Sequence, residues 1–142
     1  MENQIKIFRP FSPTIGQYQM PQNIISDVNN YVDDIVNNKK LTADQDHGSY
    51  LAGEVSQEIK VDKEFLNKGL LNFIAHAVEN YIKFSDGGKI KHFKLINSWV
   101  VRQFKNEYNP IHWHGGHISG VIYFHEISEH TLPVIQRKMR IV

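Results

Sequence analysis

Apolar residues recur along the chain at two spacings, and each spacing predicts a different kind of secondary structure. After Pro21 they return every three or four residues, the period of an amphipathic helix, which we expect to end in the polar run 37–40. That set is Ile24, Val28, Tyr31, Val32 and Ile35. A clearer helix is predicted from Asp62, a suitable N-cap, to the breaker at 86–88. Its apolar stripe comprises Phe65, Leu66, Leu70, Phe73, Ile74, Ala77, Val78 and Tyr81.

Extended segments account for the other apolar positions. Residues 4–11 alternate loosely and predict a short strand, whereas 42–50 is polar and turn-forming. Residues 51–61 favour a short strand or an extended segment. The run 89–104 is rich in β-branched and aromatic residues, which favour strands. The nearly continuous apolar run 118–124 is typical of a strand that is buried on both faces.

This order of elements predicts an α+β fold in one domain over residues 1–142, in which a helical part (1–88) buttresses a β-rich part (89–142). Composition adds exclusions. The formal net charge of +1 gives no signal for nucleic acid or an anionic membrane as a partner, and the absence of cysteine excludes disulfides and Cys-ligated metal centres. Since neither a signal sequence nor an apolar run of membrane-spanning length is visible, we expect a cytoplasmic protein.

Histidines are concentrated in one short stretch. Five of the eight lie within nineteen consecutive residues, and three of them form the hexapeptide HWHGGH between two predicted strands. Two His at i and i+2 of an extended chain lie on the same face, and imidazole is the commonest protein ligand of transition metals. His112 and His114 are therefore the first candidate metal ligands, with His117 as a third. The alternative is a polar loop whose histidines are incidental.

Three kinds of metal site fit these residues. A zinc site of His112, His114 and His117 would leave one position for water, as in hydrolytic zinc enzymes. A cupin-type site also uses His-x-His but expects Glu four or five residues later, where this chain has Ile118 and Ser119, and this counts against it. A non-haem Fe(II) site needs two His and a carboxylate and leaves positions for cosubstrate and oxygen.

The surrounding sequence resembles one family. The stretch SWVVRQFKNEYNPIHWHGGHISGVIYF (98–124) is similar to the motif region of the 2-oxoglutarate/Fe(II) oxygenase superfamily, and most of all to small oxygenases of phages and marine bacteria. The resemblance covers most of residues 45–126. It implies a double-stranded β-helix, a jelly roll of two facing sheets, with helices against the larger sheet. His112 would begin the metal site, His114 would stand where most members have Asp or Glu, and His117 is a candidate substitute for that carboxylate.

The resemblance also implies a chemistry. Fe(II) would be the cofactor and 2-oxoglutarate the cosubstrate, which is decarboxylated to succinate while a C–H bond of the substrate is hydroxylated. Trp99, Gln103 and Tyr123 are candidates for lining the pocket, although each is also an ordinary strand residue. The substrate itself is not predicted, because one fold serves many substrates. If the protein is phage-encoded, its expected location is the host cytoplasm.

The family pattern extends further than this sequence does. It expects a distal metal-binding His and an Arg that pairs with the far carboxylate of 2-oxoglutarate, but only eighteen residues follow Phe124. His130, Arg137 and Arg140 have the right types, yet they follow too soon for strands to run out and return between them. We therefore expect an incomplete β-helix, truncated or completed by a second copy or a partner chain, with weak or absent activity alone. Two alternatives stay open: a non-redox His-ligated metal-binding domain, and a structural or assembly protein without catalysis.

Overall fold

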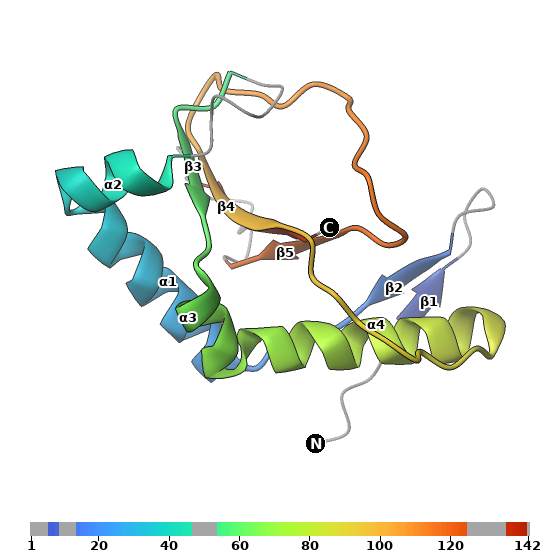
Figure 1. Ribbon diagram of the computed structural model, residues 1–142. Helices are drawn as coiled ribbons and strands as arrows, with labels where there is room; N and C mark the ends of the chain where they lie inside the picture. The colour runs from blue at the N-terminus through green and yellow to red at the C-terminus, as the bar shows by residue number, and fades with distance from the viewer. Residues whose placement is uncertain (1–5, 9–13, 47–53, 125–135, 142) are drawn as a thin grey trace.

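Helices and antiparallel sheets both build this protein, so the predicted mixture of α and β structure is confirmed (Figure 1). The computed structural model describes residues 6–8, 14–46 and 54–124, and the backbone of residues 136–141. In chain order the elements are β1 (Lys6–Phe8), β2 (Ile15–Gln17), α1 (Gln22–Val36), α2 (Lys39–Gln45), β3 (Gln57–Lys60), α3 (Lys63–Phe65), the π-helical turn η2 (Leu66–Leu70), α4 (Leu71–Asp86), β4 (Ser98–Gln103), β5 (Gly120–Tyr123) and β6 (Gln136–Ile141).

Hydrophobic periodicity predicts the first of the two N-terminal helices but not the second. α1 agrees with the helix predicted from its apolar period and buries Val28, Val32 and Ile35. α2 has no buried residue, which is why hydrophobic periodicity did not indicate it. Its start is set by Asn38, whose side-chain oxygen accepts hydrogen bonds from the amides of Lys40 and Leu41. The expected turn over 42–50 is therefore wrong for its first four residues, while residues 47–50 lie outside the described part.

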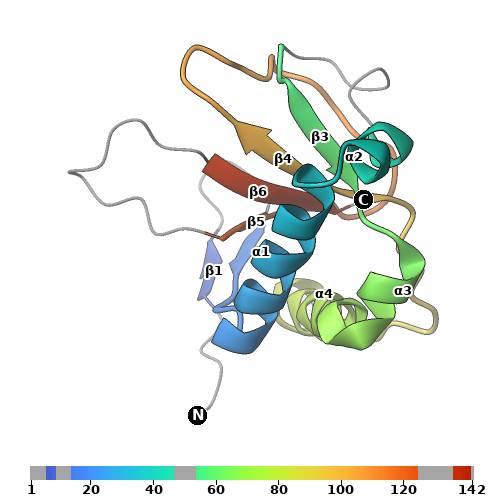
Figure 2. The ribbon, with the colours of Figure 1, turned by 90° about the vertical axis from the view of Figure 1, so that its left-hand side faces the viewer.

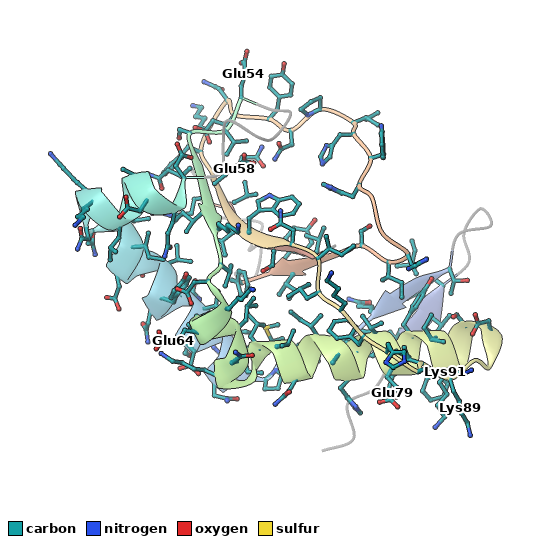
Figure 3. All side chains as sticks on the ribbon, viewed as in Figure 1. Glu54, Glu58, Glu64, Glu79, Lys89 and Lys91 are labelled. Carbon is teal, nitrogen blue, oxygen red and sulfur yellow. The ribbon has the colours of Figure 1, made fainter. Side chains whose placement is uncertain are left out.

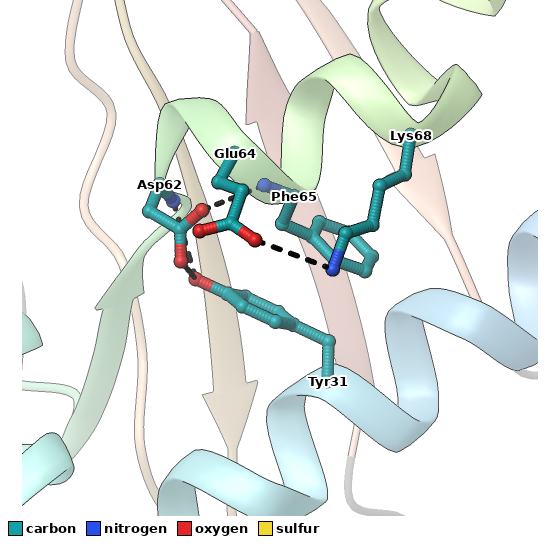
Figure 4. Close-up of polar contacts among 5 residues, drawn as sticks. All are labelled: Tyr31, Asp62, Glu64, Phe65 and Lys68. Carbon is teal, nitrogen blue, oxygen red and sulfur yellow. Dashed lines mark hydrogen bonds and ion pairs between the residues drawn. The ribbon is translucent and has the colours of Figure 1, made fainter.

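The long helical stretch α3–η2–α4 begins at Asp62, as predicted. The Asp62 carboxylate accepts a hydrogen bond from the Phe65 amide at 2.7 Å and caps the helix (Figure 4). The Tyr31 hydroxyl of α1 donates to the same carboxylate at 2.9 Å, and the Tyr31 ring stacks on Phe65 at 4.1 Å between centroids. Glu64 and Lys68 form an exposed ion pair at 3.8 Å, which adds little stability. The cap and the stacked rings hold α1 against the start of this helix.

One glycine interrupts this helical stretch. Gly69 has a φ of 126°, outside the range of a regular helix, and the chain makes a π-helical turn around it. Glycine adopts such a φ at little cost because it has no Cβ. This break was not predictable from hydrophobic periodicity, since the apolar stripe continues on both sides of it. α4 then ends at the predicted place, with Gly87 in the left-handed conformation that closes many helices.

Four strands form the main sheet in the order β3-β4-β6-β5, and every neighbouring pair is antiparallel. β6 lies between β4 and β5, so Trp99 of β4 is opposite Arg140 of β6, and Val101 is opposite Lys138. The expectation that strands cannot run out and return before Arg137 and Arg140 is therefore wrong, because β5 and β6 do so. The eighteen residues after Phe124 leave room for one or two strands, and β6 is one of them. Its position in the middle of the sheet had no signal in the sequence.

Two other predictions for the β-rich part need correction. Of the run 89–104 only β4 is a strand, and residues 89–97 lead to it without forming one. β5 lies within the predicted strand 118–124, but it is not buried on both faces. Val121 and Tyr123 are 48% and 58% exposed, whereas Ile122 between them packs against the core. Burial alternates along β5, as it does in a strand with one covered face.

The core lies between the helices and one face of the sheet. α1 runs along this face, and Val32 of α1, Ile59 of β3 and Val100 of β4 belong to one buried cluster with residues of η2 and α4 (Figure 2). Trp99 and Val101 are equally buried but lie on the opposite face, because successive strand residues point to opposite sides. Among the described residues, no helix is long and apolar enough to cross a membrane. The two sheets within the described ranges have four and two strands, and they do not include the second large sheet of a double-stranded β-helix.

Candidate metal site

The candidate ligands lie in the connection from β4 to β5, residues 104–119 (orange in Figure 1). The structure brings His112 and His114 together: their Nε2 atoms are 3.0 Å apart, and the rings are nearly perpendicular with centroids 4.7 Å apart. Both residues are half-buried. Trp113 between them is 87% exposed, so the extended chain turns its two imidazoles to one side and the indole to the other.

A backbone carbonyl sets the protonation of the first imidazole. His112 Nδ1 lies 2.6 Å from the Pro110 carbonyl oxygen. Because a carbonyl only accepts hydrogen bonds, Nδ1 carries a proton, and in the neutral ring the Nε2 lone pair is available. The carbonyl thus selects the tautomer that metal-bound imidazoles use, in which one nitrogen binds and the other donates. Without a metal, the same Nε2 accepts a hydrogen bond from Nε2–H of His114.

The separation of the two nitrogens tests whether a metal fits. With metal–nitrogen bonds of about 2.1 Å, two imidazoles at a right angle on an octahedral ion place their nitrogens about 3.0 Å apart, and at a tetrahedral angle about 3.4 Å. At 3.0 Å, the length of the hydrogen bond between the two rings, the Nε2 atoms of His112 and His114 are about as close as two ligands of one ion. Within the described residues, no third His, Asp or Glu joins them in a cluster that could hold a metal. The pair therefore fits two adjacent positions of an ion whose other positions the described residues leave to further ligands.

Trp99 packs directly against this pair. Its ring meets the His114 ring edge-on, with centroids 5.4 Å apart, and only 2% of Trp99 is exposed. The histidines therefore lie over the face of the sheet that is turned away from the helices. Since directly opposed residues of antiparallel strands share a face, Lys138 and Arg140 of β6 occupy positions on this same face. These two positions were not predicted to share this face; the alternation of basic and apolar residues in 138–141 was the available signal.

The other predicted site residues have mixed positions. His117 is exposed, and the structure does not bring it to the pair, so its role as a ligand stays a prediction. Gln103 is half-buried at the end of β4 and donates a hydrogen bond to the Glu107 carbonyl oxygen at 2.6 Å. Tyr123 is on the exposed side of β5, and by register it shares the face of Trp99. Trp99 is thus the pocket candidate that contacts the histidine pair.

No protein-family model, no curated protein and no solved structure matches this chain.

Proposed function

We propose that this protein is an Fe(II)-binding domain of the 2-oxoglutarate oxygenase type, whose metal is held first by His112 and His114. The observation that carries the proposal is that their Nε2 atoms lie 3.0 Å apart, about as close as two ligands of one ion. A zinc site at the same pair is the main alternative. The resemblance of residues 98–124 to the family motif favours Fe(II) over zinc.

Neighbouring groups hold the two histidine rings in their orientations. The Pro110 carbonyl holds the His112 ring by its Nδ1–H, and the buried edge of Trp99 supports the His114 ring. These contacts limit the rotation of both imidazoles and keep their Nε2 atoms close together. In this proposal the third ligand is His117 or His130; the latter lies outside the described residues.

The opposite end of a dicarboxylate cosubstrate needs a cation. Arg140 meets this requirement by position: it is opposite Trp99 in the sheet and therefore shares the face over which His114 packs. A guanidinium binds a carboxylate through two parallel hydrogen bonds, which fixes its orientation as well as its place. We assign the far carboxylate of 2-oxoglutarate to Arg140, with Lys138 as the neighbouring cation.

The proposed fold is a double-stranded β-helix of which β3-β4-β6-β5 is the larger sheet. An antiparallel sheet of four strands with helices packed on one face supports it, because the family resemblance implies helices against the larger sheet. When bound, Fe(II) and 2-oxoglutarate would supply the reaction with dioxygen in which 2-oxoglutarate loses CO2 to become succinate and a substrate C–H bond is hydroxylated, one atom of dioxygen going to each product. The chain's own residues would hold the ion, orient the cosubstrate and, through Trp99, support the His114 ring from the sheet.

Calorimetric titration with Co(II), an air-stable substitute for Fe(II), tests this proposal. We expect one equivalent to bind, and 2-oxoglutarate to bind more tightly once the metal is present. His112→Ala should abolish both effects. His76→Ala is the matched control, because His76 is exposed on α4 and hydrogen-bonds only to Asn80 among the contacts described for it. Metal binding that leaves 2-oxoglutarate affinity unchanged would instead favour a non-redox metal domain, and no binding would favour a structural protein.

A further inference from the structure

One carboxylate ties the beginning of the histidine-bearing connection to two strands. Glu107 accepts hydrogen bonds from the backbone amide of Phe104, just after β4, at 2.8 Å, and from that of Ser56, just before β3, at 3.1 Å. Each carboxylate oxygen serves one of these donors. Hydrogen bonds to an ionised acceptor are stronger than those between neutral groups. The side chain of Glu107 therefore joins segments about fifty residues apart in the sequence.

The backbone of the same residue is also engaged. The Glu107 amide donates to the Phe104 carbonyl at 3.2 Å and closes a turn, in which Asn106 has a φ of 70°. The Glu107 carbonyl accepts from the Gln103 side chain at 2.6 Å. Asn tolerates the left-handed conformation that this turn needs. All the main hydrogen-bonding groups of Glu107 thus bind β4, its following turn or the segment before β3.

The anchored residues lead directly into the histidine pair. Tyr108, the next residue, accepts through its carbonyl a hydrogen bond from the Glu54 amide at 3.1 Å, and the two residues form an isolated bridge. Figure 3 labels Glu54 at the end of the chain segment that enters β3. Four residues after Tyr108 comes His112. The position of the histidine pair over Trp99 is therefore set at its N-terminal side by Glu107 and this bridge.

We propose that Glu107 is a positioning residue for the metal site: its carboxylate fixes the β4 end and the segment before β3 as one unit, and this unit holds His112 and His114 at ligand spacing. The inference rests on the proposed metal function of the pair. The hydrogen bonds given for Glu107 join it to Ser56, Gln103 and Phe104. Glu107 acts on the free-energy cost of bringing the two imidazoles together when a metal binds. If the connection that carries them were mobile, this cost would be higher.

Three variants of the full-length chain separate positioning from general stability. Glu107→Gln keeps the size of the side chain but leaves only one oxygen to accept for two amides. Glu54→Gln removes the same charge from an exposed neighbour whose bridge uses backbone atoms alone. Val28→Ala weakens the core on the far side of the sheet, where Val28 is buried in α1. Co(II) affinity and the midpoint of urea unfolding are measured for each.

We expect Glu107→Gln to lower Co(II) affinity about tenfold, the lower end of the effect of residues that orient metal ligands. Glu54→Gln should leave the affinity unchanged, and Val28→Ala should leave it unchanged although it unfolds at lower urea. An affinity of Glu107→Gln within twofold of wild type would overturn the inference, as would an equal loss in Val28→Ala.

A readout without metal keeps this inference separate from the proposed function. If the wild-type chain binds no Co(II), the metal function fails, and the role of Glu107 is decided by NMR. We then expect faster hydrogen exchange of the Phe104 and Ser56 amides in Glu107→Gln, together with a weaker nuclear Overhauser effect between the His112 and His114 rings. Unchanged exchange and an unchanged ring–ring signal would refute the positioning role.

Discussion

The two tryptophans, both changed to alanine, give the sharpest test of how the histidine-bearing connection lies on the sheet. Trp99 is 2% exposed and touches His114, whereas Trp113 is 87% exposed, although both belong to the same family-like stretch. Truncating a buried Trp costs about 3–5 kcal/mol, from lost burial and from the cavity that remains. Truncating an exposed one usually changes stability by less than about 0.5 kcal/mol. We therefore expect Trp99→Ala to unfold about 10–15 °C below wild type, at roughly 3 °C per kcal/mol, and Trp113→Ala to unfold within about 2 °C of it.

Fluorescence makes this comparison specific, because each variant retains one tryptophan. Urea unfolding of Trp113→Ala reports Trp99, whose emission should be blue-shifted in the folded state and move to the red on unfolding. The emission of Trp99→Ala comes from Trp113 and should already be red in the folded state. Equal stability losses in the two variants, or a blue-shifted folded emission from Trp113, would show that the connection is packed differently from this structure.

Three further changes test other parts of the account. Tyr31→Phe removes the hydroxyl that donates to the Asp62 carboxylate and accepts from the Asp62 amide. It should lower the free energy of unfolding, measured in urea, by about 1–3 kcal/mol. A change below about 0.5 kcal/mol would show that the helix cap does not depend on Tyr31. Gly69→Ala should lower the free energy of unfolding by about 1–2 kcal/mol, because Gly69 has a φ of 126° that alanine adopts only with strain. A Cβ at this position meets no atom within 4 Å, so no steric clash adds to that cost. A stabilised variant would mean that the helix continues without a break. Burial raises the pKa of Glu107, but the hydrogen bonds from Phe104 and Ser56 outweigh it and hold that pKa below its usual value. A carboxyl with a lowered pKa in the folded state stabilises above its unfolded pKa and loses this contribution as the pH falls through its folded pKa. The difference in unfolding free energy between wild type and Glu107→Gln should therefore shrink as the pH falls from 7 towards 3, and a constant difference would contradict the proposed hydrogen bonds.

The helices were predictable because their signals are local. The apolar period of α1, the cap at Asp62 and the Gly87 terminus are all set by residues within a few positions of one another. Where the signal was weak the prediction failed: α2 buries nothing, and Gly69 sits inside an apolar stripe that continues past it. Hydrophobic periodicity depends on burial. It therefore cannot predict a helix that buries no residue, nor a change of helical geometry within a buried helix.

The sheet was less predictable because its order depends on contacts between distant residues. Strand propensity indicated β4 and β5, but no local pattern in their sequences predicts that β6 lies between them in the sheet. The two histidines were identified from residue type and spacing alone, and the structure brings them together. By contrast, the contacts that orient the site pair a side chain with a backbone group: His112 with the Pro110 carbonyl, and Glu107 with the Phe104 amide. Every residue supplies a backbone carbonyl, and every residue except Pro supplies an amide N–H, so such partners have no sequence pattern.

The most direct test of the central claim is an anaerobic titration of the purified chain with Fe(II), with and without 2-oxoglutarate, followed by visible absorption. We predict that a weak charge-transfer band forms when both are present, since the cosubstrate chelates the iron held by His112 and His114. The band should be absent in His114→Ala, and it should weaken in Arg140→Ala at limiting 2-oxoglutarate. Fe(II) binding without the band in wild type would contradict the assignment of an oxygenase site and leave a histidine-ligated metal domain of another kind.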